Sequence, residues 1–515
     1  MSSSDPPSPT PAAKSFRVCL NCRRKKKRCD KALPTCGRCA YSNELCVHEG
    51  DGSSEERSLD FESLTIQSIQ RRSPYPSESG YELGTPLTSF NPQSFAPLAA
   101  GDEIHTFIFR TMVETIGNRA NIEQVVTSYF VNVNTWYLVL DRPAFEVRLR
   151  ELWANPSADV CLVVLCMFLV NKLPRDSPSG TMRDGLYLSV KSALALVEAQ
   201  VTLSISLLQS RLLIALYENS HSMTQQAFVT LGSCVQMTRA FGWNRPGFWS
   251  EDRQREHPQE LKDCCLIWWT MVAFDCQNAI AYPSIKYPLS TVEVDFPIPD
   301  PSVFNNLLYP RSELSLHTDQ FLGEILYEEC PLAKSAGYAQ QVLRGRLQAG
   351  SPARRHHELS DAITAHVLNI MSGPWDTGHR FLSVTLAFIS TMMLHEPYLQ
   401  AAALSKDGPY ARSLETVASI VDSVYHISQT MNANDALQAP EPLTPGGALC
   451  IYYAARLLIV HGGVVLNGTG VQWMVKVQSF RRSLEIFRRR WSVADTYLRQ
   501  LDQALHERAT QSRMP

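Results

Sequence analysis

The sequence lacks a hydrophobic run long enough to cross a lipid bilayer. Its longest apolar stretch, VCLVVLCMFLV, covers only the eleven residues from Val160 to Val170, whereas a membrane helix needs about 20. The opening segment, MSSSDPPSPTPAAK, has no apolar stretch of the kind that secretory signals contain. We therefore expect a soluble, intracellular protein with no membrane partner, in which residues 160–170 form a buried core helix.

The sequence also lacks the short motifs of common catalytic sites. It has neither the G-x-S-x-G turn of hydrolases nor a phosphate-binding loop. HEPYL begins at His395 but has Leu399 where a zinc protease needs its second histidine, and NGTG at Asn467 has no third glycine. Asp275 lies in an apolar segment and fits a hydrogen-bonded core carboxylate better than a catalytic acid. We expect no enzyme; the alternative is a metabolite-binding or catalytic helical protein with a basic appendage.

Positive charge is concentrated near the start of the chain. The net charge is −2, yet residues 14–49 hold ten Lys/Arg against three Asp/Glu, a net of +7 that leaves −9 for the rest. Six cations stand side by side between two cysteines: Arg23, Arg24, Lys25, Lys26, Lys27 and Arg28. A basic segment on an acidic body indicates that the segment binds a polyanion.

Six of the fourteen cysteines lie in this basic segment, with the spacing C-x2-C-x6-C-x6-C-x2-C-x6-C: Cys19, Cys22, Cys29, Cys36, Cys39 and Cys46. In a reducing compartment such a pattern indicates a metal site more than a disulfide scaffold, because a C-x2-C pair brings two sulfurs to one zinc. Six thiolates can complete two tetrahedral zinc sites only if two sulfurs are shared. The repeat of the C-x2-C-x6-C unit assigns the shared sulfurs to Cys19 and Cys36. The other eight cysteines are expected to be core residues.

Each C-x2-C pair is expected to open a short helix, over residues 20–27 and 37–43. A helix that holds Lys and Arg rigidly can enter the major groove of DNA, where these side chains neutralise phosphates and read guanine. The cation run could also serve as a nuclear-import signal, which is compatible with DNA binding. An RNA-binding zinc protein is the weaker alternative, because residues 14–49 offer only Phe16 and Tyr41 as aromatic platforms.

The stretch CLNCRRKKKRCDKALPTCGRCAYSNELC resembles the fungal zinc binuclear-cluster DNA-binding domain in its cysteine spacing, its cation-rich first helix and the Pro before its fourth cysteine. The resemblance implies two zinc ions that share the first and fourth cysteines. It also implies that Lys26, four residues after the second cysteine, reads bases with Lys25 beside it, so that Arg23, Arg24, Lys27 and Arg28 contact the backbone. Family members often read CGG-type triplets in double-stranded DNA, commonly as dimers. This chain has no apolar residue between Cys22 and Cys29, unlike most of the family.

The remaining chain predicts a linker and a helical body. Residues 1–13 are expected to be disordered, 14–49 to form the zinc-cluster domain, 50–102 to form a Ser/Pro-rich linker, 103–508 to form a large all-helical domain and 509–515 to be a tail. Inside the linker, LDFESLTIQSIQRR fits a transient helix better than a dimerisation zipper. The fold class is therefore mainly all-α. Apolar-periodic segments are expected near residues 185–217, 226–242, 260–275, 360–372, 381–396, 410–431, 448–466 and 476–508. RRSLEIFRRR, within the last of them, is expected to be a solvated helix face.

The body is similar to the fungus-specific middle homology region, an all-helical regulatory domain. SYFVNVNTWYLVLDRPAF resembles its opening motif, ELKDCCLIWWTMVAFDCQNAIAYPSIKYPL its Trp-rich helix and RWSVADTYLRQL its closing helix, although Ala281-Tyr282-Pro283 replaces the usual Gly-Arg-Pro. Together the two resemblances imply a nuclear, sequence-specific transcription regulator from a fungus that works with the transcription machinery. They favour an activator over a repressor, and control of a biosynthetic gene cluster.

Overall fold

The computed structural model divides into two compact units, Met1–Tyr81 and Glu82–Pro515, which are considered separately. The structure describes residues 18–19, 22–23, 25–32, 36–42, 102–177, 180–245, 247–281, 290–291, 331–347, 353–372, 378–404, 412–434, 440, 443–465 and 471–511. The predicted linker helix, Arg24, Cys46, Cys330 and the Tyr282-Pro283 turn lie outside these residues.

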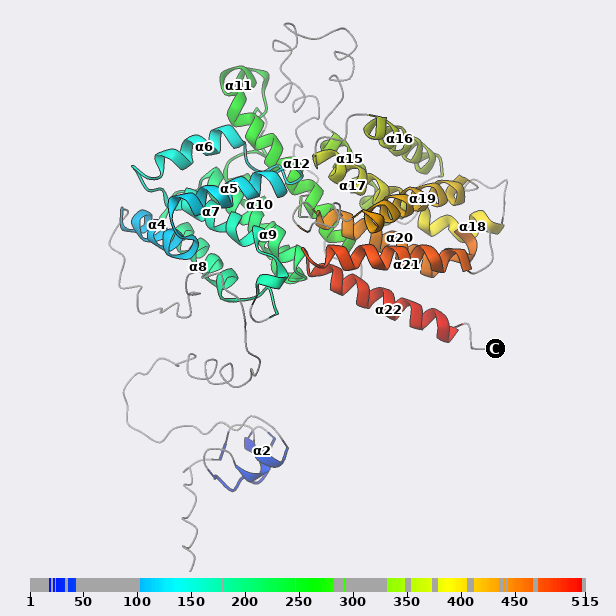
Figure 1. Ribbon diagram of the computed structural model, residues 1–515, viewed down its shortest axis with the longest axis horizontal. Coiled ribbons are helices and arrows are strands. Elements are labelled where there is room, and N and C mark those ends of the chain that lie inside the picture. Colours follow the sequence, from blue (N-terminus) through cyan, green and yellow to red (C-terminus); the bar gives the residue numbers. More distant parts are fainter. Residues whose placement is uncertain are drawn as a thin grey trace, which may run out of the picture. The chain divides into compact units, whose positions relative to one another are not determined.

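The described residues of the larger unit form helices joined by turns and loops, with no strand among them, which confirms the all-α prediction. Its first group of helices, cyan to green in Figure 1, comprises α4 (Asp102–Ile116), α5 (Arg119–Asn132), α6 (Arg142–Glu151), α7 (Ala158–Asn171), α8 (Gly185–Gln200), α9 (Ile205–Ser220), α10 (Thr224–Ala240), α11 (Glu251–Glu256) and α12 (Pro258–Ala281). Its second group, yellow-green to red, comprises α15 (Pro331–Leu347), α16 (Ala353–Ser372), α17 (Gly378–His395), α18 (Leu399–Leu404), α19 (Arg412–Ala433), α20 (Pro445–Val465), α21 (Val471–Phe487) and α22 (Val493–Gln511).

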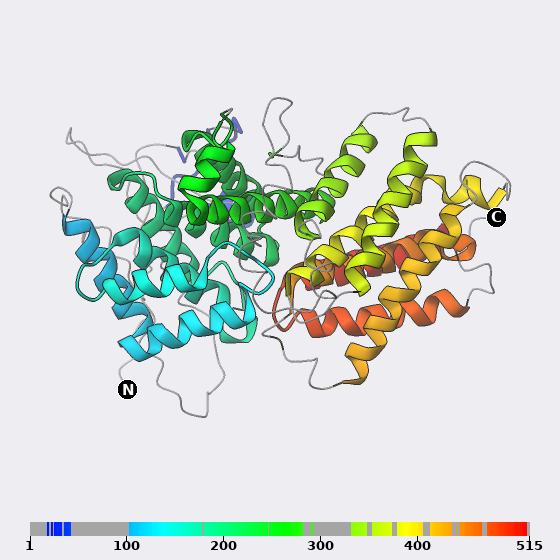
Figure 2. The same cartoon turned by 90° about the horizontal axis from the view of Figure 1, so that it is seen from above.

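Helix α12 joins the two groups. It packs against α9 and α10 of the first group and against α15 and α20 of the second, and Figure 2 shows it running from one group to the other. Its segment Asp263–Ala281 is long and apolar enough to cross a membrane by length and composition, but 94% of its apolar stretch is buried inside the protein. This is the behaviour of a central core helix, as expected also for α7, whose apolar residues are almost all buried.

Two predicted segments are each two helices. The segment at 185–217 breaks after Gln200, where Val201 is extended and the Ser204 hydroxyl accepts from the backbone N–H of Leu207 to start α9. A hydroxyl at this position satisfies an amide that has no partner within the helix. The segment at 476–508 breaks between Phe487 and Val493. Apolar periodicity continues across both breaks, so the sequence pattern alone does not reveal them.

The three motifs that resemble the middle homology region meet in one core. Trp136, from the opening motif, makes an edge contact with Trp491, from the closing one, at a ring-centroid distance of 6.2 Å. The neighbouring Tyr137 makes an edge contact with Phe274 of α12 at 5.7 Å. Aromatic pairs of this kind contribute about 0.5–1.5 kcal/mol each beyond the area that they bury. The motifs therefore act together as packing residues.

Arg490 corrects the prediction that RRSLEIFRRR is wholly a solvated face. Arg482, Arg488 and Arg489 are exposed, but Arg490 is only 1% exposed. Its guanidinium donates to the carbonyls of Val170 at 2.8 Å and of Asn171 and Lys172 at 3.2 Å. These carbonyls lie at the C-terminal end of α7, where a helix presents unpaired acceptors and partial negative charge. Arg490 therefore fastens the end of α21 to α7.

A charged network is buried between α8, α9 and α10. The Glu218 carboxylate, whose side chain is 0% exposed, accepts from Lys191 Nζ at 2.9 Å and from the Tyr187 hydroxyl at 2.8 Å. Its second oxygen accepts from the Thr230 hydroxyl at 2.6 Å. Lys191 keeps a third of its side chain in contact with solvent. Each oxygen of the buried carboxylate thus has a donor, which the burial of a charge requires.

Asp275 is the hydrogen-bonded core carboxylate that the sequence indicated. Its Oδ2 accepts from the backbone N–H of Thr291 at 2.8 Å and from the Thr291 hydroxyl at 2.7 Å. Burial outweighs these bonds and raises the pKa of the carboxyl group to about 6. The group has no acid–base partner among the residues that form these contacts.

Asp275 should make the stability of the protein depend on pH. Because the folded state holds the proton up to about pH 6 and the unfolded chain only to about pH 4, the stabilisation is complete below pH 4 and is lost as the pH rises through 6. The loss amounts to at most about 3 kcal/mol. Asp275→Asn keeps an oxygen for both Thr291 bonds and removes the titration. Urea unfolding at several pH values measures this. Between pH 4 and 6 the free energy of unfolding of the variant should rise relative to that of the wild type. If the two free energies change in parallel with pH, the assignment to Asp275 is wrong.

Candidate zinc cluster and DNA interface

Four of the six predicted zinc ligands lie together in the smaller unit. The sulfurs of Cys19, Cys22, Cys36 and Cys39 lie within 4.8 Å of one another, and all four side chains are buried. Cys19 Sγ lies 3.7 Å from both Cys36 Sγ and Cys39 Sγ, while Cys22 Sγ lies 3.8 Å from Cys36 Sγ and 4.0 Å from Cys39 Sγ. Two sulfurs that share a tetrahedral zinc at about 2.3 Å should be about 3.8 Å apart. The spacing of these thiols therefore fits zinc.

Cys36 belongs to a second group of ligand atoms as well. Its sulfur lies within 4.8 Å of Cys29 Sγ and of a carboxylate oxygen of Asp30. A sulfur that serves two metal ions needs neighbours on two sides, and Cys36 has them. The structure brings no corresponding second group to Cys19 among the described residues, and Cys46 lies outside them. The sharing of Cys19 and Cys36 thus stays a prediction.

The crowding of the sulfurs also favours a bound cation. Burial, together with contacts to Cys19, Cys36 and Cys39, raises the pKa of the Cys22 thiol. Zinc requires thiolates, so its binding must displace protons from this group of thiols and should weaken in acid. The described cysteines of the larger unit are buried, and none of them belongs to a group of three or more possible metal ligands: Cys161, Cys166, Cys234, Cys264, Cys265, Cys276 and Cys450. They are core residues, as expected.

The first helix is shorter than the sequence predicted. Cys22 and Arg23 are helical, but Lys26 has a φ of +50°, and residues 27–30 are not helical. The Lys26 amide donates to the Arg23 carbonyl at 3.1 Å, and the Lys27 amide donates to the Cys22 carbonyl at 2.9 Å. This pair of bonds is a Schellman motif, which ends a helix at a left-handed residue. The prediction of a helix over 20–27 is therefore wrong at its C-terminal end.

The cations are exposed on both sides of this turn. Two of them, Arg23 and Lys25, come before Lys26, and two more, Lys27 and Arg28, come after it. All five side chains are exposed, and Arg24 lies outside the described residues. The amide of Lys27 is bonded to the residue that supplies a cluster sulfur, Cys22. The exposed cations are thus attached directly to the buried group of sulfurs, although they do not share one helix face.

The second helix, α2 (Gly37–Tyr41), follows Cys36 as predicted and ends within two residues of the expected position. Cys36 occupies its N-cap but makes no side-chain capping bond. Asp30 caps the helix instead, because its two carboxylate oxygens accept from the Gly37 amide at 3.1 and 3.0 Å. A Cβ at position 37 would lie 2.7 Å from Asp30 Oδ2, so a larger residue there would make the Asp30 carboxylate shift.

The Asp30–Gly37 contact joins the two cysteine units without metal, and it breaks their pseudo-symmetry. The residue that follows the third cysteine of each unit is Asp30 in the first and Val47 in the second, while Leu20 in the first unit corresponds to Gly37 in the second. Only the first unit can therefore cap the helix of the other. The sequence analysis missed this role, although the acid directly after Cys29 and the glycine directly after Cys36 were its signals.

Removal of this cap should loosen the cluster. Loss of an N-cap acceptor costs about 1 kcal/mol, so Asp30→Ala should lower the product of the two zinc-binding constants about fivefold. Asp30→Asn keeps one acceptor oxygen and should lose less. Competition of the full chain against a zinc chelator of known affinity measures the change. Equal zinc retention in Asp30→Ala and the wild type would mean that the contact contributes nothing.

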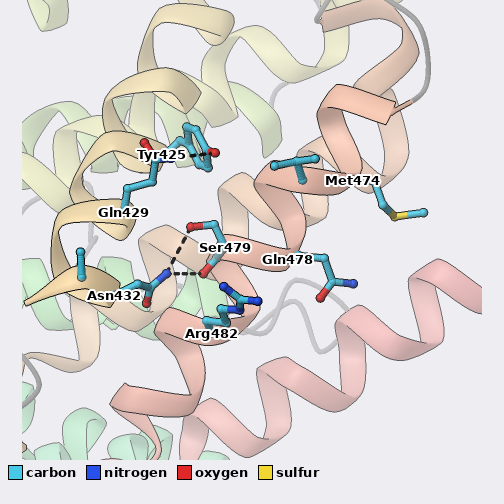
Figure 3. A pocket seen from close by; sticks show the side chains of 9 residues that line it. Tyr425, Gln429, Asn432, Met474, Gln478, Ser479 and Arg482 are labelled. Atoms are coloured by element: carbon cyan, nitrogen blue, oxygen red, sulfur yellow. Dashed lines mark hydrogen bonds between the residues drawn. The ribbon is translucent and has the colours of Figure 1, made fainter.

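The described residues of the larger unit line several hollows. Figure 3 shows the one between α19 and α21, about 620 Å³, where Asn432 Nδ2 donates to the carbonyl and hydroxyl oxygens of Ser479 at 3.0 and 3.2 Å. Its lining contains no carboxylate, histidine or cysteine. His395 of HEPYL is buried and shares hydrogen bonds with the hydroxyls of Ser360 and Ser413. Burial and then the neighbouring His356 lower the pKa of His395 to about 3, which suits a structural residue.

Two families of known proteins match the chain. Residues 17–52 match the model of the fungal Zn(2)-Cys(6) binuclear cluster domain. Residues 126–437, more than half of the chain, match the model of the fungal specific transcription factor domain. The chain belongs to the fungal zinc-cluster transcription factors. The resemblance seen in the sequence is confirmed, although α22, which contains most of the closing motif, lies beyond the second match.

Two curated proteins are similar to this zinc-cluster regulator. Transcription factor BOA15 of Botryotinia fuckeliana is 28% identical over 134 residues, which are 25% of this chain and 71% of that protein. Oleate activated transcription factor 3 of Kluyveromyces lactis is 47% identical over 47 residues, which are 8% of this chain and 7% of that protein. Together with the family matches, they identify a DNA-binding transcription regulator whose cluster domain takes two zinc ions. Membership of these families argues against an enzyme.

Proposed function

We propose that this regulator acts in the nucleus and reads CGG-like triplets of double-stranded DNA through the segment that includes Cys22 to Cys29. The observation that supports this most directly is the hydrogen bond from the Lys27 amide to the Cys22 carbonyl, which ties an exposed cation run to a buried sulfur cluster. Six cysteines would hold the two zinc ions: Cys19, Cys22, Cys29, Cys36, Cys39 and Cys46. Bound zinc would supply the charge and the cross-links that keep this backbone rigid.

The cations have two roles in this proposal. Lys26, with Lys25 beside it, would face base edges in the major groove, where lysine donates to guanine O6 and N7. The others would contact phosphates, which position the protein without carrying sequence information: Arg23, Arg24, Lys27 and Arg28. Because the helix ends before Lys27, these contacts come from a helix end and the turn after it.

The rest of the chain is proposed to regulate this contact. Residues 14–49 would form the DNA-binding domain, 50–102 the linker and 103–508 the regulatory domain, with a disordered end at 1–13 and a tail at 509–515. We further propose an activator that binds as a homodimer, contacts the transcription machinery, controls a biosynthetic gene cluster and has no enzymatic activity. If the larger unit catalyses a reaction, the alternative of an enzyme with a basic appendage would be favoured.

Selection of binding sites from random DNA with the full chain tests the proposal. We expect a consensus that contains CGG-like triplets, and their number and spacing would report dimerisation. On that site, Lys27→Ala should weaken binding to all sequences alike and make the salt dependence shallower by about one unit. Lys26→Ala should instead cost about 1–3 kcal/mol on the selected site and relax its sequence preference. If Lys26→Ala weakens a scrambled duplex by the same factor, Lys26 contacts only phosphate.

A further inference from the structure

Lys26 occupies a backbone position that suits glycine. Its φ of +50° lies in the left-handed region, where the Cβ of an L-residue is crowded by the next carbonyl oxygen. The Schellman bonds from Lys26 and Lys27 hold it there. The left-handed position of such a motif is usually a glycine, because glycine has no Cβ to crowd.

The larger unit contains the same Schellman motif at the ends of two helices to which no binding role is assigned. At the end of α10, Gly242 has a φ of +79°, its amide donates to the Arg239 carbonyl at 2.8 Å, and the Trp243 amide donates to the Thr238 carbonyl at 3.0 Å. This is the bond pattern of Lys26, with a glycine in the left-handed position. At the end of α9 the equivalent residue is Ser222, with a φ of +61°. Its hydroxyl is hydrogen-bonded to that of Thr496 at 2.8 Å.

Lys26 has no such local compensation. Its side chain is exposed and has no hydrogen-bond or ion-pair partner among the residues that the structure describes. Its neighbours along the chain, Lys25 and Lys27, carry the same charge. Neither the backbone nor the described contacts of the side chain thus favour a lysine here. Strained backbone that the fold tolerates without local benefit is a mark of a functional site.

We propose that Lys26 is retained at this turn for its contact with DNA and against the stability of the zinc-cluster domain, so that glycine in its place tightens zinc binding while it weakens DNA binding. This inference rests on the proposed function for its DNA half only. The left-handed turn places Lys26 just beyond the last helical residue, where its side chain can leave the end of the helix rather than its flank. A specific residue at this position therefore decides both how firmly the domain folds and what it binds.

Four variants of the full chain separate charge from strain. Lys26→Gly removes both; Lys26→Asn removes the charge and tolerates the left-handed region; Lys26→Ala removes the charge and keeps the strain; Lys26→Arg keeps both. In competition with a zinc chelator, Lys26→Gly should raise the product of the two zinc-binding constants about fivefold, and Lys26→Asn somewhat less. Lys26→Ala and Lys26→Arg should stay close to the wild type.

On the selected DNA site the order should be different. The Gly, Asn and Ala variants should all lose about 5- to 150-fold in affinity, while the Arg variant keeps most of it. Two controls accompany the series. Lys27→Gly changes a residue outside the left-handed position and should weaken zinc binding, because glycine loses more conformational freedom. Ser222→Gly changes the same motif in the larger unit and should leave zinc and DNA binding unchanged.

Two results would overturn the inference. If Lys26→Gly binds zinc no more tightly than the wild type, the position is not strained; if it binds DNA as tightly, the side chain is not needed. A chain that selects no DNA sequence at all would refute the proposed function instead, and the zinc measurements would still decide whether the turn is strained.

Discussion

Cys36→Ala should lose both zinc ions and all sequence-specific DNA binding, whereas Cys22→Ala should retain one ion. The reason is that Cys36 lies near sulfurs of both groups in the cluster, while Cys22 belongs to one group only. A bridging sulfur completes two coordination shells, so its loss leaves neither ion with four ligands. Binding should fall to the non-specific level, a loss of about 10³-fold or more. Elemental analysis or native mass spectrometry of the full chain counts the ions.

A matched control is available in the larger unit. Cys450 is buried in α20, and burial raises the pKa of its thiol to about 12. Cys450→Ala should therefore keep two zinc ions and full DNA binding. The same comparison extends to Cys19→Ala, which should resemble Cys36→Ala if these two sulfurs are shared. Equal zinc loss in Cys22→Ala and Cys36→Ala would remove the support for a bridging role of Cys36.

Lys191→Met should destabilise the larger unit by about 3 kcal/mol, at the lower end of the usual cost of breaking a buried ion pair. The variant leaves the Glu218 carboxylate, which is fully buried, with only the hydroxyls of Tyr187 and Thr230 as donors. We choose the lower end because a third of the Lys191 side chain is in contact with solvent in the native protein. Urea unfolding followed by circular dichroism measures the change, and zinc retention should not alter.

A double variant tests whether Lys191→Met lowers stability because it leaves the buried Glu218 charge without its ion-pair partner. Lys191→Met with Glu218→Gln removes both charges and keeps an acceptor for the Tyr187 hydroxyl, so it should recover much of the lost stability. Glu218→Gln alone leaves Lys191 free to turn toward water and should cost less than Lys191→Met alone. If the double variant is as unstable as the sum of the single ones, the network contributes through packing and not through charge.

The sequence predicted those features that depend on local spacing. The six cysteines carry the spacing of a two-zinc cluster. In helix α12 the spacing of Leu261, Cys265, Trp268 and Val272 indicated a buried face, and all four residues are buried. Such patterns are visible because one helix turn or one C-x2-C turn fixes which side chains lie together. The fold class and the approximate place of most helices follow from them.

Features set by backbone conformation or by distant partners were not predictable in this way. A run of six cations is compatible with an uninterrupted helix, and nothing in it marks Lys26 as the left-handed residue that ends the helix. Arg490 stands among four exposed-looking arginines, and its burial depends on carbonyls about 320 residues away. Helix α15, which packs against α12 and α17, was missed as well, as were α4, α5 and α6.

The attachment of Arg490 to the end of α7 has a consequence for how the chain is made. Val170 leaves the ribosome 320 residues before Arg490, which at about 5–20 residues per second is a delay of about 15–65 s. During that interval the last carbonyls of α7 lack their bond to Arg490, and the ring of Trp136 lacks its contact with Trp491. The exposed groups of the first helices are therefore covered by water, by transient packing or by chaperones until Arg490 and Trp491 are synthesised. A stop codon shortly before Arg490 would give a nearly full-length protein that can never form these two contacts.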